Sequence, residues 1–62
     1  MKIKSLRLKA GLSQIELSRV MGVAQPTVSG WESEKISPSS DKLPKLTKVL
    51  NCTIDDLYRK ED

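Results

Sequence analysis

Signals that start and end helices lie close together in the first half of this chain. Ser13 and Glu16 have the spacing of a capping box, in which each side chain bonds the backbone amide of the other residue. Gly22 can adopt the left-handed conformation that ends a helix, and Pro26 is best tolerated in the first turn of a new one. The sequence therefore predicts two short helices here, the second over residues 25–32, joined by a very short turn.

The apolar residues around Gly22 are spaced so that the two helices can pack against each other. A steep crossing needs a small residue where the helices meet, and Ser18 occupies that position. The residues expected to face inward are Leu17, Met21, Val23, Val28 and Trp31. The pattern predicts a helix-turn-helix centred on residues 14–31, and a helical hairpin without a ligand is the alternative. Ile15 and Val20 lie off the inward face, and the pattern gives them no role.

Helical patterns also flank this motif on both sides. One helix is predicted over residues 2–10, where apolar side chains recur at helical spacing. Another is predicted over residues 42–50. Pro44 must fall in its first turn, which favours Asp41 as the N-cap residue, and Asn51 can end the helix in the left-handed conformation.

The C-terminal part of the chain predicts one more helix. It begins at Thr53, whose spacing to Asp56 resembles a capping box with aspartate in place of glutamate. A polar loop over residues 33–40 separates the central motif from this end, and residues 59–62 are expected to fray. Together these patterns predict an all-α fold, a compact bundle of five short helices that makes residues 1–62 a single domain.

The composition argues against an enzyme. The 62 residues include no histidine and one cysteine, so an imidazole base, a disulfide framework and the usual metal ligands are missing. A chain of this length buries only about 60% of its unfolded surface, which leaves no room for a deep substrate pocket. We therefore expect no cofactor and no metal, and we interpret Cys52 as a small, half-buried apolar residue in a reducing cytoplasm.

Neither a membrane span nor a signal peptide is expected. No apolar run approaches the roughly 20 residues that a membrane span requires. The basic N-terminal residues are followed by no apolar stretch of the kind that a signal peptide has. These observations predict a cytoplasmic protein.

Positive charge is concentrated in the half of the chain that holds the motif. Residues 1–31 contain five lysine or arginine residues and one acidic residue. Residues 32–62 contain six lysine or arginine residues and seven acidic residues. A basic segment of this kind fits a polyanionic partner, and an ordinary solvated surface is the alternative.

Residues that match a known family run through nearly the whole chain. They include Gly11-Leu12-Ser13-Gln14, Glu16-Leu17, Met21-Gly22-Val23, Gln25, Thr27-Val28-Ser29, Trp31-Glu32, Leu43-Pro44-Lys45-Leu46 and Leu50-Asn51-Cys52-Thr53-Ile54-Asp55-Asp56-Leu57. With these residues the chain resembles the phage repressor and Cro family of helix-turn-helix domains, often called XRE-like. The resemblance implies the lambda repressor-like fold and sequence-specific binding of double-stranded operator DNA. It also implies regulation of transcription, as a repressor.

The resemblance further implies roles for single residues. The helix over residues 25–32 would enter the major groove, and Gln14 and Lys35 would contact backbone phosphates. Gln25 would read a base edge, which its amide suits because it can pair with N6 and N7 of adenine. The remaining residues placed along the groove are Pro26, Thr27, Ser29 and Gly30. Arg7 and Glu32 match an ion pair that ties the first helix to the end of the recognition helix.

Four residues depart from the family pattern. Pro26 and Gly30 stand where relatives often carry base-reading side chains. Few side chains are therefore left to form hydrogen bonds with bases, and DNA shape is expected to contribute more to the sequence specificity. Ala24 replaces a capping serine or threonine, which weakens the helix start by about 1 kcal/mol. Glu34 replaces a glycine and adds a negative charge near the expected phosphates.

A weak homodimer on a palindromic site is expected, because one short recognition helix supplies too little affinity alone. The predicted dimer surface is C-terminal and comprises Asn51, Thr53, Ile54, Leu57 and Tyr58, of which one or two must fill the monomer core. The alternative function is an antitoxin-like or other protein-interaction module with a protein partner at the same surface. RNA binding is a weaker alternative, because the chain has only two aromatic residues to stack on bases.

Overall fold

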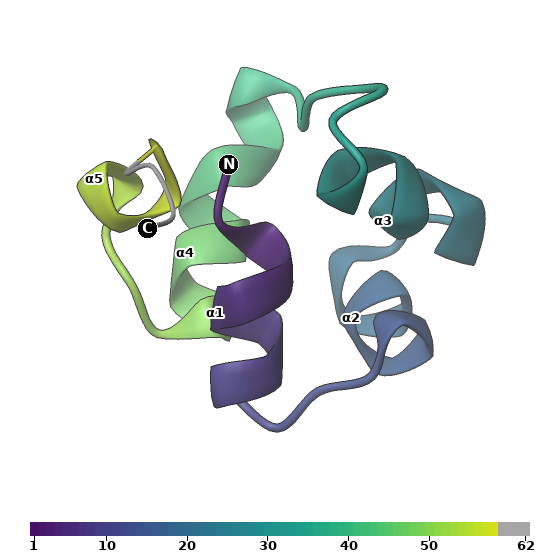
Figure 1. The fold of residues 1–62 in the computed structure, drawn as a ribbon, viewed down its shortest axis with the longest axis horizontal. Helices are drawn as coiled ribbons and strands as arrows, with labels where there is room; N and C mark the ends of the chain where they lie inside the picture. Colours follow the sequence, from purple (N-terminus) through teal and green to yellow (C-terminus); the bar gives the residue numbers. More distant parts are fainter. Residues whose placement is uncertain (59–62) are drawn as a thin grey trace.

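Two consecutive helices joined by a three-residue turn form one side of the molecule. The computed structural model describes residues 1–58, so the expected fraying of residues 59–62 lies outside the described residues. Helix α2 (Gln14–Met21) and helix α3 (Gln25–Glu32) lie to the right of helices α1 (Ile3–Lys9) and α4 (Leu43–Leu50) in Figure 1.

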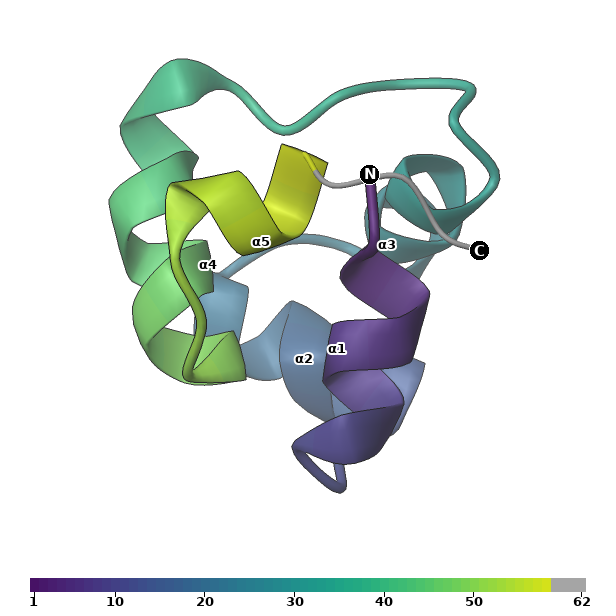
Figure 2. The ribbon, with the colours of Figure 1, turned by 60° about the vertical axis from the view of Figure 1, so that its left-hand side comes forward.

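The rest of the described chain closes the bundle from the other side. Helix α5 (Ile54–Tyr58) lies to the left of α4 in Figure 1, and a short 3-10 helix, η1 (Ser40–Lys42), leads directly into α4. Figure 2 shows the long connection from α3 to η1 crossing over the top of the molecule. The described chain is all-helical, as the sequence predicted, and no helix in it is long and apolar enough to cross a membrane.

The core is shared by all five α-helices. Its buried side chains are Ile3 from α1, Leu17 and Met21 from α2, Val28 and Trp31 from α3, Leu46 and Leu50 from α4, and Leu57 from α5. The inward set predicted for the central motif is confirmed, with Val23 packed against the core at its edge. Ser18 is buried at the crossing, and its hydroxyl donates to the carbonyl oxygen of Ile15 at 2.7 Å.

Local capping explains why α2 and α5 start where they do. The Ser13 hydroxyl accepts a hydrogen bond from the Glu16 amide at 3.0 Å, and the Glu16 carboxylate accepts one from the Ser13 amide at 2.9 Å. Thr53 and Asp56 exchange the same two bonds at 3.1 and 3.0 Å. Gly22 ends α2 in the left-handed conformation with φ 71°. Both predicted capping boxes and the glycine terminator are therefore confirmed.

The predicted cap of α4 is wrong. Asp41 lies inside η1, and α4 follows Lys42 without a side-chain cap. The reason is that helical backbone geometry already begins at Ser40, so the extended residue that a cap requires is Ser39, with ψ 154°. The left-handed terminator predicted at Asn51 is confirmed, with φ 53° and ψ 52°.

Candidate nucleic-acid interface

A buried ion pair joins α1 to the last residue of α3. Arg7 Nε lies 2.5 Å from Glu32 Oε2, and Nη2 of the same guanidinium donates to Glu32 Oε1 at 3.4 Å. The two side chains are 9% and 5% exposed, so water screens the pair only weakly. Arg7 Nη1 also donates to the carbonyl oxygen of Leu12 at 2.7 Å. The arginine therefore fixes both the end of α3 and the connection that leads into α2.

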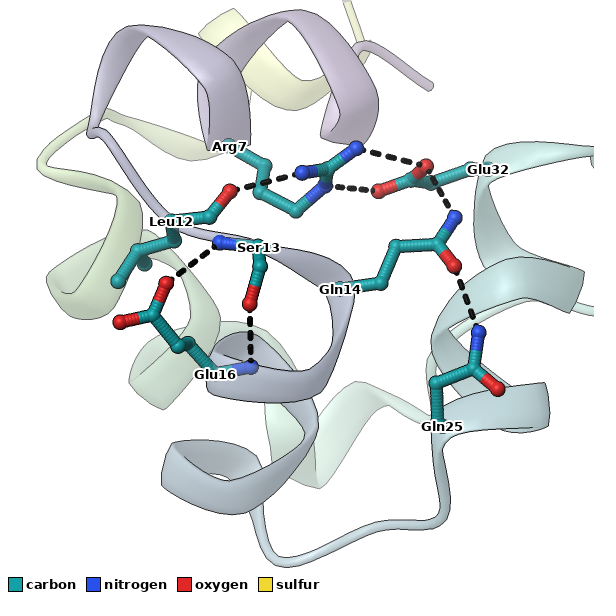
Figure 3. Close-up of polar contacts among 7 residues, drawn as sticks. All are labelled: Arg7, Leu12, Ser13, Gln14, Glu16, Gln25 and Glu32. Atoms are coloured by element: carbon teal, nitrogen blue, oxygen red, sulfur yellow. Dashed lines mark hydrogen bonds and ion pairs between the residues drawn. The ribbon is translucent and has the colours of Figure 1, made fainter.

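Two glutamines extend this ion pair to the surface (Figure 3). Gln14, the first residue of α2, donates from Nε2 to Glu32 Oε1 at 2.9 Å. Its Oε1 accepts a hydrogen bond from Nε2 of Gln25 at 2.7 Å. Gln25 is exposed and is the first residue of α3. We call the series Arg7, Glu32, Gln14 and Gln25 the polar relay, because each member bonds the next across three helices.

The charge of Glu32 is stabilised within the relay. Burial by itself raises the pKa of this carboxyl group. The hydrogen bonds from Arg7 and Gln14, together with the positive charges of Arg7 and Lys4, outweigh burial and lower the pKa below its ordinary value of 4.5. Glu32 is therefore an ionised acceptor at neutral pH, and Gln14 must turn its amide nitrogen toward it.

The outward side of α3 is formed by small residues. Pro26, Gly30 and Ser33 recur at helical spacing on the side opposite Val28 and Trp31, which are both buried. Of the other residues placed along the groove from the sequence, Thr27 and Ser29 are half-buried, and neither joins the polar relay.

The loop after α3 folds back onto Gly30. The Gly30 carbonyl oxygen accepts hydrogen bonds from the amides of Lys35 at 3.0 Å and Ile36 at 3.3 Å, and from the Ser33 hydroxyl at 3.3 Å. Glu34 has φ 62°, a conformation that non-glycine residues rarely adopt. The exposed Lys35 is thereby held beside the end of α3.

Ile36 is a residue of this surface that the sequence analysis missed. A Cβ atom built on Gly30 would lie 2.7 Å from Cγ1 and 2.9 Å from Cδ1 of Ile36. Ile36 thus occupies the space into which a side chain at Gly30 would project. The loop has no periodic pattern that would predict this contact. The only signal in the sequence was a glycine on the outward side of a helix, which leaves space for another side chain.

The start of α3 has no side-chain cap. Ala24 is extended, with ψ 151°, and its carbonyl oxygen accepts the Thr27 amide at 2.9 Å. Pro26 occupies the first turn, as predicted, where its missing N–H costs no helical hydrogen bond. With alanine as its N-cap residue, α3 has a start that is held mainly by its backbone.

The residues of the predicted C-terminal surface divide between the core and the exterior, as the sequence required. Leu57 is fully buried in the core and is not available for contact with a second copy of the chain. Ile54 and Tyr58 are 42% and 59% exposed, and Asn51 and Thr53 are exposed beside them in the chain. One of the five predicted residues therefore fills the monomer core.

Comparison with known proteins shows similarity to an antitoxin, to a transcriptional regulator and to a phage repressor. The chain is 40% identical over 50 residues to antitoxin HigA1 of Mycobacterium tuberculosis, covering 81% of this chain and 34% of HigA1. It is 34% identical over 61 residues to an uncharacterized HTH-type transcriptional regulator of Archaeoglobus fulgidus, covering 98% and 87%. It is 31% identical over 58 residues to repressor protein C2 of Salmonella phage P22, covering 94% and 27%.

The extent of these matches differs between the relatives. The chain spans about a third of the length of HigA1 and most of the length of the archaeal regulator. The helix-turn-helix family itself matches residues 3–57, from the first residue of α1 into α5. The chain therefore belongs to the helix-turn-helix family of the phage repressor and Cro type.

Proposed function

We propose that this chain binds double-stranded DNA in a sequence-specific manner and regulates transcription as a repressor, with α3 in the major groove. The polar relay is the observation that carries the proposal. It places the amide of Gln25, an exposed residue, at the start of α3 in a defined orientation. Side chains that read bases must be held in this way, because a bidentate contact tolerates little misplacement.

Gln25 is the base-reading residue of the proposal. Its Nε2 already donates one hydrogen to Gln14, which leaves its Oε1 and its second N–H for a base edge. An acceptor and a donor side by side match N6–H and N7 of adenine. Gln14, whose backbone amide lies in the first turn of α2, and Lys35 are proposed to contact phosphates on either side.

Pro26, Thr27, Ser29 and Gly30 are proposed to line the groove-facing side of α3. Pro26 and Gly30 carry no side-chain donor, so at these positions the helix offers shape and close approach instead of hydrogen bonds. The excess of basic residues in residues 1–31 supports the same partner, because it favours a polyanion.

Selection of binding sites from random duplex DNA tests the proposal. We expect a defined sequence with at least one adenine whose replacement weakens binding of the natural chain but not of Gln25→Ala. Binding that is equal for all duplexes and depends only on salt would contradict sequence-specific recognition.

We further propose that two copies bind a palindromic site as a weak dimer through the C-terminal surface. Ile54 and Tyr58 are the exposed apolar side chains there, flanked by Asn51 and Thr53. With Leu57 inside the core, the free apolar area is small, so the chain should be monomeric when dilute and pair only on DNA.

Footprinting on sites of altered spacing tests the dimer. Two-fold pairing predicts two protected half-sites roughly 34–36 Å apart, and protection should be lost when the spacing is changed by half a helical turn. The double variant Ile54→Ser/Tyr58→Ser should protect half-sites independently of spacing. A footprint of the natural chain that ignores spacing would contradict pairing.

A protein-binding function is the second candidate, favoured by the similarity to antitoxin HigA1. Ile54 and Tyr58 would then bind a protein partner. Co-expression with the product of the neighbouring reading frame, followed by purification of this chain, tests the idea. A partner that co-purifies with the natural chain and not with Ile54→Ser/Tyr58→Ser would support it, and the absence of co-purification would contradict it.

A further inference from the structure

We propose that Ile36 recognises the C5-methyl group of a thymine in the major groove. Gly30 makes this possible because its missing side chain leaves the space in which Ile36 packs against α3. The inference rests on the proposed function, because it requires α3 to lie in the groove. It adds a specificity-determining residue that is not part of the recognition helix.

The contact between Ile36 and Gly30 is close and specific. A side chain at Gly30 would collide with Cγ1 and Cδ1 of Ile36, at 2.7 and 2.9 Å from its Cβ atom. Two backbone hydrogen bonds, from Lys35 and Ile36 to the Gly30 carbonyl oxygen, hold the loop in this position. Glycine is therefore required for Ile36 to lie against the helix.

The position of Ile36 puts it on the surface proposed to face DNA. Gly30 lies on the outward side of α3 with Pro26, opposite the buried Val28 and Trp31. A side chain over Gly30 therefore projects from that same side. Ile36 remains 48% exposed after packing on Gly30, so about half of its surface is available to a ligand.

The chemistry of the exposed part selects the ligand. Isoleucine offers no hydrogen bond, so it can distinguish base pairs only by apolar contact. Among the four bases, thymine alone presents a methyl group in the major groove. Ile36 would thus contact a base from the loop, which Gly30 cannot do from the helix because it has no side chain.

Replacement of thymine by deoxyuridine tests the inference, because it removes only the methyl group. Each thymine of the selected site is replaced in turn, and affinity is measured for the natural chain and for Ile36→Ala. We expect the natural chain to lose about fourfold at one thymine of each half-site, which is the effect of one buried methyl-sized group. Ile36→Ala should bind the thymine and deoxyuridine duplexes equally.

Two further variants separate contact from folding. Ile36→Val keeps a branched apolar side chain and should retain most of the discrimination. Gly30→Ala leaves Ile36 in the chain but forces its side chain to move, so it should lose the discrimination while its circular dichroism remains helical.

The results that would overturn the inference are distinct from those that would overturn the proposed function. Equal fold losses on deoxyuridine for the natural chain and Ile36→Ala, or no loss at any thymine, would show that Ile36 reads no methyl group. Failure to select any preferred sequence would overturn the proposed function, and this inference with it.

Discussion

Nε2 of Gln25 donates a hydrogen bond to Oε1 of Gln14 at 2.7 Å, so the first residues of α3 and α2 are joined by their side chains. The buried carboxylate of Glu32 determines the direction of this bond. Glu32 is ionised and accepts from Gln14 Nε2, which turns the amide nitrogen of Gln14 toward Glu32 and its amide oxygen toward Gln25. A buried carboxylate thereby determines which atoms the exposed glutamine presents to a ligand.

Gln25→Ala should weaken binding to the preferred DNA site by about 1–3 kcal/mol and leave binding to random DNA nearly unchanged. The reason is that a base contact contributes only at the matching sequence, whereas phosphate contacts contribute everywhere. Equilibrium titrations at one salt concentration measure both affinities. Lys35→Ala is the matched comparison, because loss of a phosphate contact should weaken both kinds of binding together. Equal losses for Gln25→Ala on the two DNAs would show that it reads no base.

Features fixed by short-range chemistry were predictable from the sequence. The capping boxes at Ser13 and Thr53 depend on side chains three residues apart, and Gly22 and Asn51 end helices by their own backbone preference. The core face of α2 followed from its periodicity, with Leu17 fully buried.

Features that depend on tertiary packing were not predictable. Helix α5 has five residues, too few for periodicity to show that Leu57 would be buried while Ile54 and Tyr58 stay exposed. The Arg7–Glu32 pair of the polar relay, 25 positions apart, was expected only through the family resemblance, and the hydrogen bonds that continue it through Gln14 to Gln25 depend on the fold. The contact of Ile36 with Gly30 arises from a loop that returns to its helix.

Leu17→Ala should destabilise the protein by about 2–5 kcal/mol, because it removes a fully buried side chain and leaves a cavity. In a domain this small, that is a large part of the total stability. Urea unfolding followed by circular dichroism measures the change. Ile15→Ala is the control on the same helix, since Ile15 is 53% exposed and should change stability by no more than about 0.5 kcal/mol. Similar losses in the two variants would contradict the observed face of α2.

Stability should fall in acid through the titration of Glu32. Its pKa in the folded protein is below the ordinary value of 4.5, so its contribution is complete above pH 4.5. That contribution is lost as the pH falls through the lowered, folded-state pKa. Glu32→Gln should be about 3–5 kcal/mol less stable at neutral pH, because Arg7 is left buried without its charge partner.

Unfolding free energies measured from pH 7 to pH 3, in a stabilising osmolyte to keep the variant folded, test this expectation. The natural chain should lose stability below about pH 4.5, and the loss should be smaller in Glu32→Gln. Glu16→Gln is the comparison, because it alters an exposed carboxylate of the capping box. This variant should still lose the stability that depends on ionised Glu32 as the pH falls. Identical pH profiles for the natural chain and Glu32→Gln would rule out this origin of the acid sensitivity.

Gly30→Ala should stabilise the protein fully only when the Ile36 side chain is absent. Alanine in a helix interior is favoured over glycine by about 1 kcal/mol. In the natural chain this gain is offset, because the new Cβ atom lies 2.7 Å from Cγ1 of Ile36 and displaces that side chain from α3. In Ile36→Ala only the Cβ atom of residue 36 remains, 4.0 Å away, which is ordinary van der Waals contact. The full gain of about 1 kcal/mol should then appear.

Urea unfolding of the four proteins of this double-mutant cycle gives the coupling energy directly. A gain from Gly30→Ala that is the same in both backgrounds would mean that Ile36 does not occupy the space over Gly30 in solution, and the glycine would then need another explanation.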